Sequence, residues 1–233
     1  MQLERIELLV DSGRADRARA ELVGLLAAQP DDVGARCMLA RCHLECRDYE
    51  STLEAAAEVL RLDPEHVCSW WQRAQALGHL GRLDEAVAAA RETVRLDPDD
   101  VRAHVSLSHW LAYHGRPYEA FQVAGRAVRL GPDDPEAHMI RGTAARMLDR
   151  WDTARESFDT ALGLDPWHAG TQIELAHWYW HDGDRKAGIR LLRRLLSEEP
   201  NNEDALYMLK SMSGKGRIMM ALLRWLERIP TER

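Results

Sequence analysis

The sequence is poor in lysine and contains no long uncharged stretch. Only Lys186, Lys210 and Lys215 are lysines among the 31 basic residues, and the formal net charge is −7. Because a negatively charged chain is poorly suited to a phosphate backbone, we expect no nucleic-acid partner. No stretch reaches the roughly 18 uncharged residues of a membrane span. The preference for arginine over lysine is typical of a bacterial genome of high GC content.

Charged residues near the start of the chain also argue against an export signal. Glu4 and Glu7 interrupt the apolar beginning "MQLERIELLV", whereas the apolar core of a secretory signal carries no charge. We therefore expect a cytoplasmic protein.

Cysteines are few and confined to one third of the chain, at Cys37, Cys42, Cys46 and Cys68. In a cytoplasmic chain of this size we expect free thiols rather than a disulfide framework. Cys42 and Cys46 do not have the spacing of a zinc knuckle, and we expect both to be small core residues.

Common catalytic and cofactor motifs are missing from the sequence. It has no glycine-rich phosphate loop, no nucleophile elbow and no His-Glu-x-x-His helix. "SGKG" at 213–216 lacks the strand–loop–helix context of a phosphate loop, so it is predicted to be a turn between helices. His177 and His181 have the four-residue spacing of metal ligands on a helix, but no third ligand is evident. We predict that the protein is not an enzyme and holds no cofactor or metal.

A strict repeat is what the sequence does contain. Six prolines stand at an interval of 34 residues, without insertion: Pro30, Pro64, Pro98, Pro132, Pro166 and Pro200. A fixed period of this length indicates a repeat architecture. Seventeen residues before these prolines stand Gly13, Arg47, Gly81, Gly115, Asp149 and Gly183.

Each period carries two helical patterns, and residues 67–98 show both. In the first run Trp70, Ala74 and Leu77 are spaced three and four residues apart, which places them on one helix face. Gly81 is predicted to end this helix in a left-handed conformation, which glycine accepts without strain.

The second run, from 83 to 96, has its own apolar stripe and is stopped by Pro98, because proline cannot continue a helix. Asp99 and Asp100 are expected to cap the helix that follows. Twelve residues before each proline of the period stands a small residue, so that two helices can approach closely there. These residues are Ala18, Thr52, Ala86, Ala120, Ala154 and Gly188.

These features resemble the tetratricopeptide repeat family. The positions that carry the match are Trp70, Ala74 and Leu77 for the first helix and Ala154, Phe158 and Pro166 for the second. The resemblance implies an all-α, right-handed superhelical α-solenoid of about six repeats, followed by a C-terminal capping helix pair. Such helix pairs stack because one pair cannot bury its apolar face alone. The implied repeats are about 1–32, 33–66, 67–100, 101–134, 135–168 and 169–202, with a partial repeat and an amphipathic capping helix at 203–233.

The resemblance also implies a concave groove that is lined by the first helix of each repeat. We predict that the protein is an interaction scaffold or adaptor that binds a peptide or protein partner there. Aromatic and arginine side chains most often dominate binding surfaces, although some of these aromatics could only fill space between helices. The predicted contact residues are Trp71, Gln75, His79, Arg102, His109, Tyr113, Arg146, His177, Trp180, His181 and Tyr207.

The last segment differs from the repeats. Its apolar residues cover a wide arc, whereas Arg217, Arg224 and Arg228 align on the other side. An end cap of the solenoid explains this pattern. The alternative is a basic amphipathic helix that docks to an anionic membrane or to a partner, which would make the protein a peripheral membrane adaptor or regulator. Self-association through the chain ends is also left open.

Overall fold

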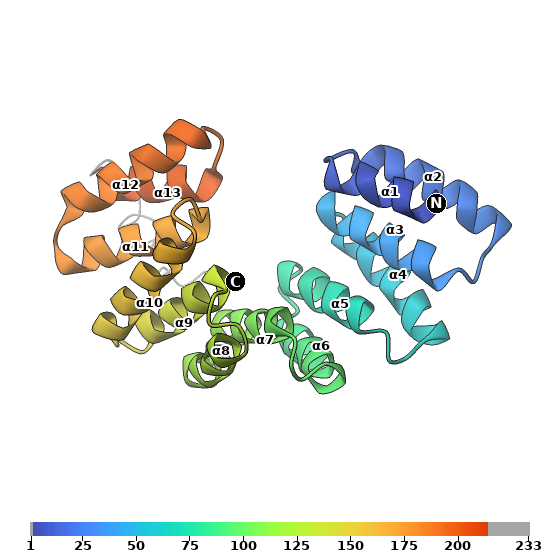
Figure 1. Cartoon of the computed structure of the whole chain (residues 1–233), viewed down its shortest axis with the longest axis horizontal. Helices are drawn as coiled ribbons and strands as arrows, with labels where there is room; N and C mark the ends of the chain where they lie inside the picture. The colour runs from blue at the N-terminus through green and yellow to red at the C-terminus, as the bar shows by residue number, and fades with distance from the viewer. Residues whose placement is uncertain (1, 214–233) are drawn as a thin grey trace, which may run out of the picture. The chain divides into compact units, whose positions relative to one another are not determined.

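The computed structural model describes residues 2–213, and every regular element in that range is an α-helix of 10 to 14 residues (Figure 1). The predicted all-α repeat fold is therefore confirmed. The helices are α1 (Gln2–Asp11), α2 (Ala15–Ala28), α3 (Val33–Glu45), α4 (Tyr49–Leu62), α5 (Val67–His79), α6 (Leu83–Leu96), α7 (Val101–Tyr113), α8 (Pro117–Leu130), α9 (Pro135–Met147), α10 (Trp151–Leu164), α11 (Ala169–Asp182), α12 (Arg185–Glu198) and α13 (Glu203–Met212).

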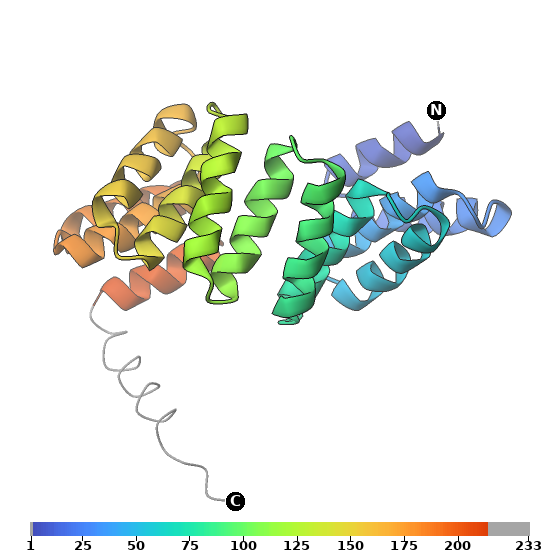
Figure 2. The ribbon, with the colours of Figure 1, turned by 90° about the horizontal axis from the view of Figure 1, so that it is seen from below.

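The helices group into two compact units, the first ending at Leu130 and the second beginning at Gly131. Unit 1 contains α1 to α8 and unit 2 contains α9 to α13. Within each unit successive helices pack side by side, as the two views in Figures 1 and 2 show. Contacts between alternate helices in the described part of the chain join only first helices, such as α3 with α5 and α9 with α11. The first helices therefore form the more closely spaced layer of each unit.

Every turn inside the six helix pairs contains one residue with a positive φ. The left-handed conformation predicted for Gly81 is confirmed, with a φ of 75°. Arg47 and Asp149 stand at the same place in the period and have φ of 58° and 57°. A left-handed residue ends a helix because it lets the following N–H groups bond to the last carbonyls. Arg47 and Asp149 therefore adopt the left-handed conformation although it costs a residue with a side chain about 1 kcal/mol. We attribute this to the stacking of the helices. The turns of the other three helix pairs have a glycine with positive φ at this place: Gly13, Gly115 and Gly183.

One of the two predicted caps of α7 is confirmed. The Asp100 side chain accepts a hydrogen bond from the backbone N–H of Arg102 at 3.0 Å, which satisfies one of the open donors of the first turn. The cap predicted for Asp99 is wrong, because Asp100 occupies the N-cap position. Asp99 instead accepts a hydrogen bond from Arg126 Nη2 at 3.2 Å.

The six small residues of the period all lie in the second helices of the pairs and are buried. Gly188 of α12 shows why size matters there. A Cβ at this position would lie 2.4 Å from the Met212 side chain and 3.0 Å from the carbonyl oxygen of Ala176. The close approach of α12 to its neighbours therefore requires a residue without a side chain.

The last described helix completes the core of unit 2. Ala205, Met208 and Met212 of α13 pack with Leu192 and Leu195 of α12 in one buried cluster. The second helix of the predicted capping pair lies outside the described residues.

Candidate partner-binding face

The first helices of unit 1 border a cleft of about 780 Å³, which we call the α5 cleft. Its walls come from α3, α5, the end of α6 and the turn into α7. A cleft of this size is large enough to hold a small ligand or a few peptide side chains. The lining residues are Arg41, Glu45, Val67, Cys68, Trp71, Gln72, Thr93, Asp97, Asp99, Asp100 and Arg102.

Trp71 presents its ring to this cleft, whereas the neighbouring glutamines hold α5 in place. Trp71 is partly exposed, so it combines packing on the protein with apolar area for a partner. Gln72 is 1% exposed, and its Nε2 donates to the carbonyl oxygen of Cys37 on α3 at 3.0 Å. Gln75 donates to Ser106 Oγ on α7 at 2.8 Å. Trp71 is therefore the α5 side chain best placed to contact a partner.

Carboxylates outnumber arginines around the α5 cleft. The acidic lining residues are Glu45, Asp97, Asp99 and Asp100, and the basic ones are Arg41 and Arg102. A negative balance of this kind attracts a positively charged partner segment and repels a negatively charged one.

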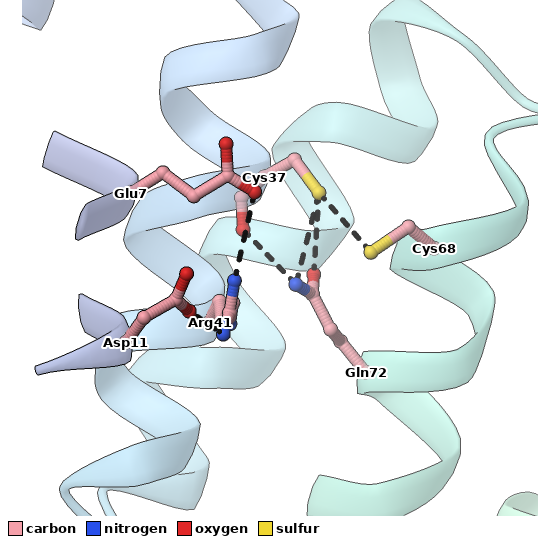
Figure 3. Close-up of polar contacts among 6 residues, drawn as sticks. All are labelled: Glu7, Asp11, Cys37, Arg41, Cys68 and Gln72. Atoms are coloured by element: carbon pink, nitrogen blue, oxygen red, sulfur yellow. Dashed lines mark hydrogen bonds and ion pairs between the residues drawn. The ribbon is translucent and has the colours of Figure 1, made fainter. Parts of the chain in front are cut away.

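The two arginines differ in how firmly the protein holds them. Arg41 Nη2 lies 2.6 Å from Asp11 Oδ1, and Arg41 Nη1 lies 3.9 Å from Glu7 Oε1, so two α1 carboxylates hold its charge (Figure 3). The Arg102 side chain is 83% exposed, and its Nε lies 3.8 Å from Asp100 Oδ1. Arg41 is paired with α1 and Asp99 with Arg126, so the charge balance of the other lining residues stays negative.

A pair of thiols lies on the α3 side of the cleft (Figure 3). Cys37 Sγ and Cys68 Sγ are 3.4 Å apart, and Cys68 is exposed. The hydrogen bond with Cys37 and the charges of Arg102 and Arg41 lower the pKa of the Cys68 thiol to about 7, against the opposing effect of burial. The hydrogen bond with Cys68 and burial raise the pKa of the Cys37 thiol above its ordinary range. Cys37 therefore keeps its proton, and its S–H group donates a hydrogen bond to the Cys68 thiolate.

Sequence reasoning missed this pair because 31 residues separate the two cysteines. Only the repeat period could have placed them on adjacent first helices. All four cysteines are free thiols, as predicted, and Cys42 is buried. The core position predicted for Cys46 is wrong, because this residue follows the last turn of α3 and is exposed.

Histidine and aromatic rings meet at the C-terminal ends of α5 and α7. His79 stacks on Tyr49 with 4.7 Å between ring centroids. His109 lies 4.6 Å from the Trp110 ring and 4.7 Å from the Tyr113 ring. Burial, together with the charge of His79, lowers the pKa of His109 to about 4. His109 is thus a neutral member of an aromatic cluster, while Tyr113 is 69% exposed at its edge.

In unit 2 an ion pair between the first helices α9 and α11 lies on the corresponding face. Arg146 Nε of α9 lies 2.9 Å from Glu174 Oε2 of α11, and these side chains are only 21% and 22% exposed. Burial and the charge of Arg146 lower the pKa of His177, which lies one turn further along α11. The protein itself therefore satisfies the charge of Arg146.

Aromatic contacts continue along the same face of unit 2. The His181 ring stacks on Trp151 with 3.4 Å between centroids. Trp178 Nε1 donates to the carbonyl oxygen of Trp151 at 2.9 Å. Trp180 and Tyr207 remain 38% and 57% exposed.

Metal-ligand clusters and membrane-spanning helices are both absent from the part of the chain that the structure describes. Residues 2–213 contain no group of three His, Cys, Asp or Glu side chains arranged to hold a metal ion. None of the helices α1 to α13 is long and apolar enough to cross a membrane. The predicted docking residues Arg217, Arg224 and Arg228 lie outside the described range.

Solved structures with the same helical architecture come from several bacteria. A tetratricopeptide repeat protein from Parabacteroides merdae superposes with a TM-score of 0.73 at 15% identity, covering 94% of this chain and 86% of its own. The pilF protein of Pseudomonas aeruginosa gives a TM-score of 0.70 at 16% identity, covering 88% and 93%. YrrB, a repeat protein described as having an unusual peptide-binding site, gives a TM-score of 0.55 at 19% identity. The match covers 81% of this chain and 97% of YrrB. At such identities the likeness shows the fold alone.

Models of the tetratricopeptide repeat match residues 3–64, 46–101, 110–167 and 145–212. Proteins of this fold typically serve as non-catalytic scaffolds for protein–protein interaction. Because the matched segments span most of the sequence, this chain belongs to the tetratricopeptide repeat family.

Proposed function

We propose that the protein is a cytoplasmic adaptor that binds a peptide segment of a partner protein in the α5 cleft. The segment presents a lysine or arginine beside an apolar or aromatic side chain. The observation that carries this proposal is the partly exposed Trp71 ring within a cleft whose carboxylates outnumber its arginines. The protein acts by binding rather than by catalysis.

The chemistry of the cleft favours such a segment over a neutral or acidic one. A large aromatic side chain that lines a cleft is the kind of residue on which binding energy concentrates. The carboxylates of Asp97 and Glu45 offer charge complementarity to a nearby cation, which mainly sets specificity and association rate. The peptide-binding site described for the related fold of YrrB is consistent with a peptide ligand.

A selection from a random peptide library displayed on phage tests this proposal on the full chain. Enriched peptides are expected to pair lysine or arginine with an apolar or aromatic residue and to bind less tightly as salt is raised. Trp71→Ala should weaken the binding of a synthetic enriched peptide by at least about tenfold. Helical content should stay near that of the wild type.

Trp167→Ala is the matched control. Trp167 is 53% exposed in unit 2, between α10 and α11, and the Arg194 guanidinium lies 4.4 Å from its ring centroid. This variant should bind the peptide as the wild type does. Enrichment of acidic peptides, or normal binding by the Trp71 variant, contradicts the proposal. Loss of binding in Trp180→Ala alone would move the binding site to unit 2.

The alternative, membrane docking through Arg217, Arg224 and Arg228, has support from the sequence pattern alone. Co-sedimentation with anionic phospholipid vesicles separates it from peptide binding. Docking through this segment requires that sedimentation is lost when residues 214–233 are deleted and is unchanged by Trp71→Ala.

A further inference from the structure

We propose that Cys37 and Cys68 form a redox-active thiol pair that hydrogen peroxide converts reversibly into an intramolecular disulfide between α3 and α5. This inference goes beyond partner binding and does not depend on the identity of a partner.

The geometry of the pair is already close to that of a disulfide. The two Sγ atoms are 3.4 Å apart, so bond formation needs an approach of about 1.4 Å, which is within the reach of small side-chain rotations. α3 and α5 contact each other directly. Gln72 connects them, since its Nε2 donates to the Cys37 carbonyl oxygen at 3.0 Å and lies 3.7 Å from Cys37 Sγ. The helices therefore hold the thiols together before any oxidation.

The two sulfurs have different chemical roles. Cys68 is exposed on the α5 cleft, where peroxide can reach it. Its pKa of about 7 gives a substantial thiolate fraction at neutral pH, and the thiolate is the reactive form. Cys37 is less exposed and retains its proton, which suits a resolving thiol. Burial raises the pKa of Cys42 to about 11, so this cysteine lacks the same reactivity.

The reaction balances in two steps. The Cys68 thiolate attacks one oxygen of hydrogen peroxide and breaks the O–O bond, which gives a sulfenic acid at Cys68 and hydroxide, and the hydroxide takes up a proton to become water. Cys37 then loses its proton and attacks the Cys68 sulfur. The S–O bond breaks and the leaving hydroxide takes up the Cys37 proton, which gives a second water. The peroxide gains two electrons, and the two thiols lose two electrons and two protons.

Oxidation would also change the α5 cleft. It removes the Cys68 thiolate, whose negative charge interacts with Arg102 and Arg41. It also links the first helices of two successive repeats covalently. The redox state of the pair thus acts on the same surface that contains Trp71.

Peroxide treatment of the reduced full chain, followed by intact mass and non-reducing peptide mapping, tests the inference. The wild type is expected to lose two hydrogen atoms and to yield one linked peptide pair containing Cys37 and Cys68. Dithiothreitol should restore all four thiols. Cys46→Ser is the matched control with an exposed cysteine removed, and it should form the same link.

Two further variants make the roles of the sulfurs separable. Cys68→Ser should form no link, and its remaining thiols should be consumed at least about tenfold more slowly. Cys37→Ser should accumulate a Cys68 sulfenic acid that dimedone traps. Far-ultraviolet circular dichroism confirms that each variant is folded, and Cys68→Ala and Cys37→Ala replace any serine variant that is not. The inference is overturned if the folded wild type gives only Cys46-linked dimers or over-oxidised Cys68, or if the Cys68 variant is oxidised at the wild-type rate.

Discussion

The first-helix faces of the two units use similar residues in different ways. In unit 1, Trp71 is partly exposed in an acidic cleft, beside an exposed thiol. In unit 2, the ion pair of Arg146 with Glu174 and the stack of His181 on Trp151 join side chains of the face to the protein itself. Unit 1 therefore presents an aromatic ring among carboxylates, whereas in unit 2 Arg146 and His181 are paired within the protein, and Trp180 and Tyr207 are the exposed aromatic side chains of the face.

This difference shows why the residue types of a groove do not identify its binding site. An arginine or histidine contributes to partner binding only if the folded protein leaves its polar atoms or ring face available. Arg146 and His181 met the sequence criterion for contact residues as well as Trp71 did. The predictions below test how far the contrast between the two faces extends, beginning with the largest expected effect.

The aromatic cluster of unit 1 should make the protein sensitive to acid. The pKa of His109 is about 4 in the folded chain, against an ordinary value of 6.5. Between these values the unfolded chain binds more protons, so the free energy of unfolding falls as pH falls through 6.5 toward 4. The loss from this group is up to about 3 kcal/mol. His109→Phe, which keeps an aromatic ring beside Trp110, should remove most of this dependence in urea denaturation at pH 7 and pH 4.5.

His177 sharpens the same comparison in unit 2. Its pKa is also lowered, by burial and by the charge of Arg146, so His177→Phe should reduce the acid sensitivity in the same direction. If the free energy of unfolding of His109→Phe depends on pH as that of the wild type does, the wild-type His109 ring must be accessible to water. That result would contradict the place of His109 in the aromatic cluster.

Both units contain a first-helix glycine beneath an aromatic ring. A Cβ at Gly78 would lie 2.3 Å from the Trp110 ring, and a Cβ at Gly142 would lie 2.4 Å from the Phe158 ring. Both rings are almost fully buried and cannot easily move aside. Gly78→Ala and Gly142→Ala should therefore each lower the free energy of unfolding in urea by roughly 1–3 kcal/mol.

Two helical glycines in open space provide the controls for these variants. A Cβ at Gly24 or Gly163 would meet no neighbouring side chain of the described residues within 4 Å. Alanine there should raise the free energy of unfolding by about 0.5–1 kcal/mol, because alanine has the higher helix propensity. Stabilisation by the Gly78 or Gly142 variant would mean that the corresponding ring can be displaced at little cost.

The smallest expected effect concerns the ion pairs on the two faces. A double-mutant cycle of Arg146→Met and Glu174→Gln should give a coupling energy of about 1–2 kcal/mol, because both side chains are mostly buried. The Arg41–Asp11 pair of unit 1 has side chains 38% and 51% exposed. A cycle of Arg41→Met and Asp11→Asn should give about 0.5 kcal/mol, since water and salt screen exposed pairs. Equal couplings would remove this distinction between the faces.

Much of the fold could be predicted because its signals are local. Pro98 and Gly81 mark helix ends through their own backbone preferences. The small residue at Gly188 indicates a close crossing through its size alone. Arg47 and Asp149 could not be recognised as left-handed from their residue types, because stacking between helices imposes that conformation on them.

The candidate site was harder to predict than the fold. Trp71 and Arg102 were among the predicted contact residues, and both line the α5 cleft. The acidic wall was missed because Glu45 lies at the end of α3, whereas Asp97 and Asp99 lie in the turn between α6 and α7, and only packing brings these segments to one cleft. The position of Cys46 was predicted wrongly because the helical pattern does not show that α3 ends at Glu45, so that Cys46 lies beyond its last turn and is exposed.

The amino-acid sequence alone determined the repeat, its period, the helix pairs and the family, since each depends on the backbone preference and size of residues that recur along the chain. Only the tertiary structure decided that Cys37 meets Cys68, that Glu174 neutralises Arg146 and that Trp71 stands among carboxylates. Those outcomes depend on side chains about one repeat apart in sequence, whose charge and burial are set when the helices pack.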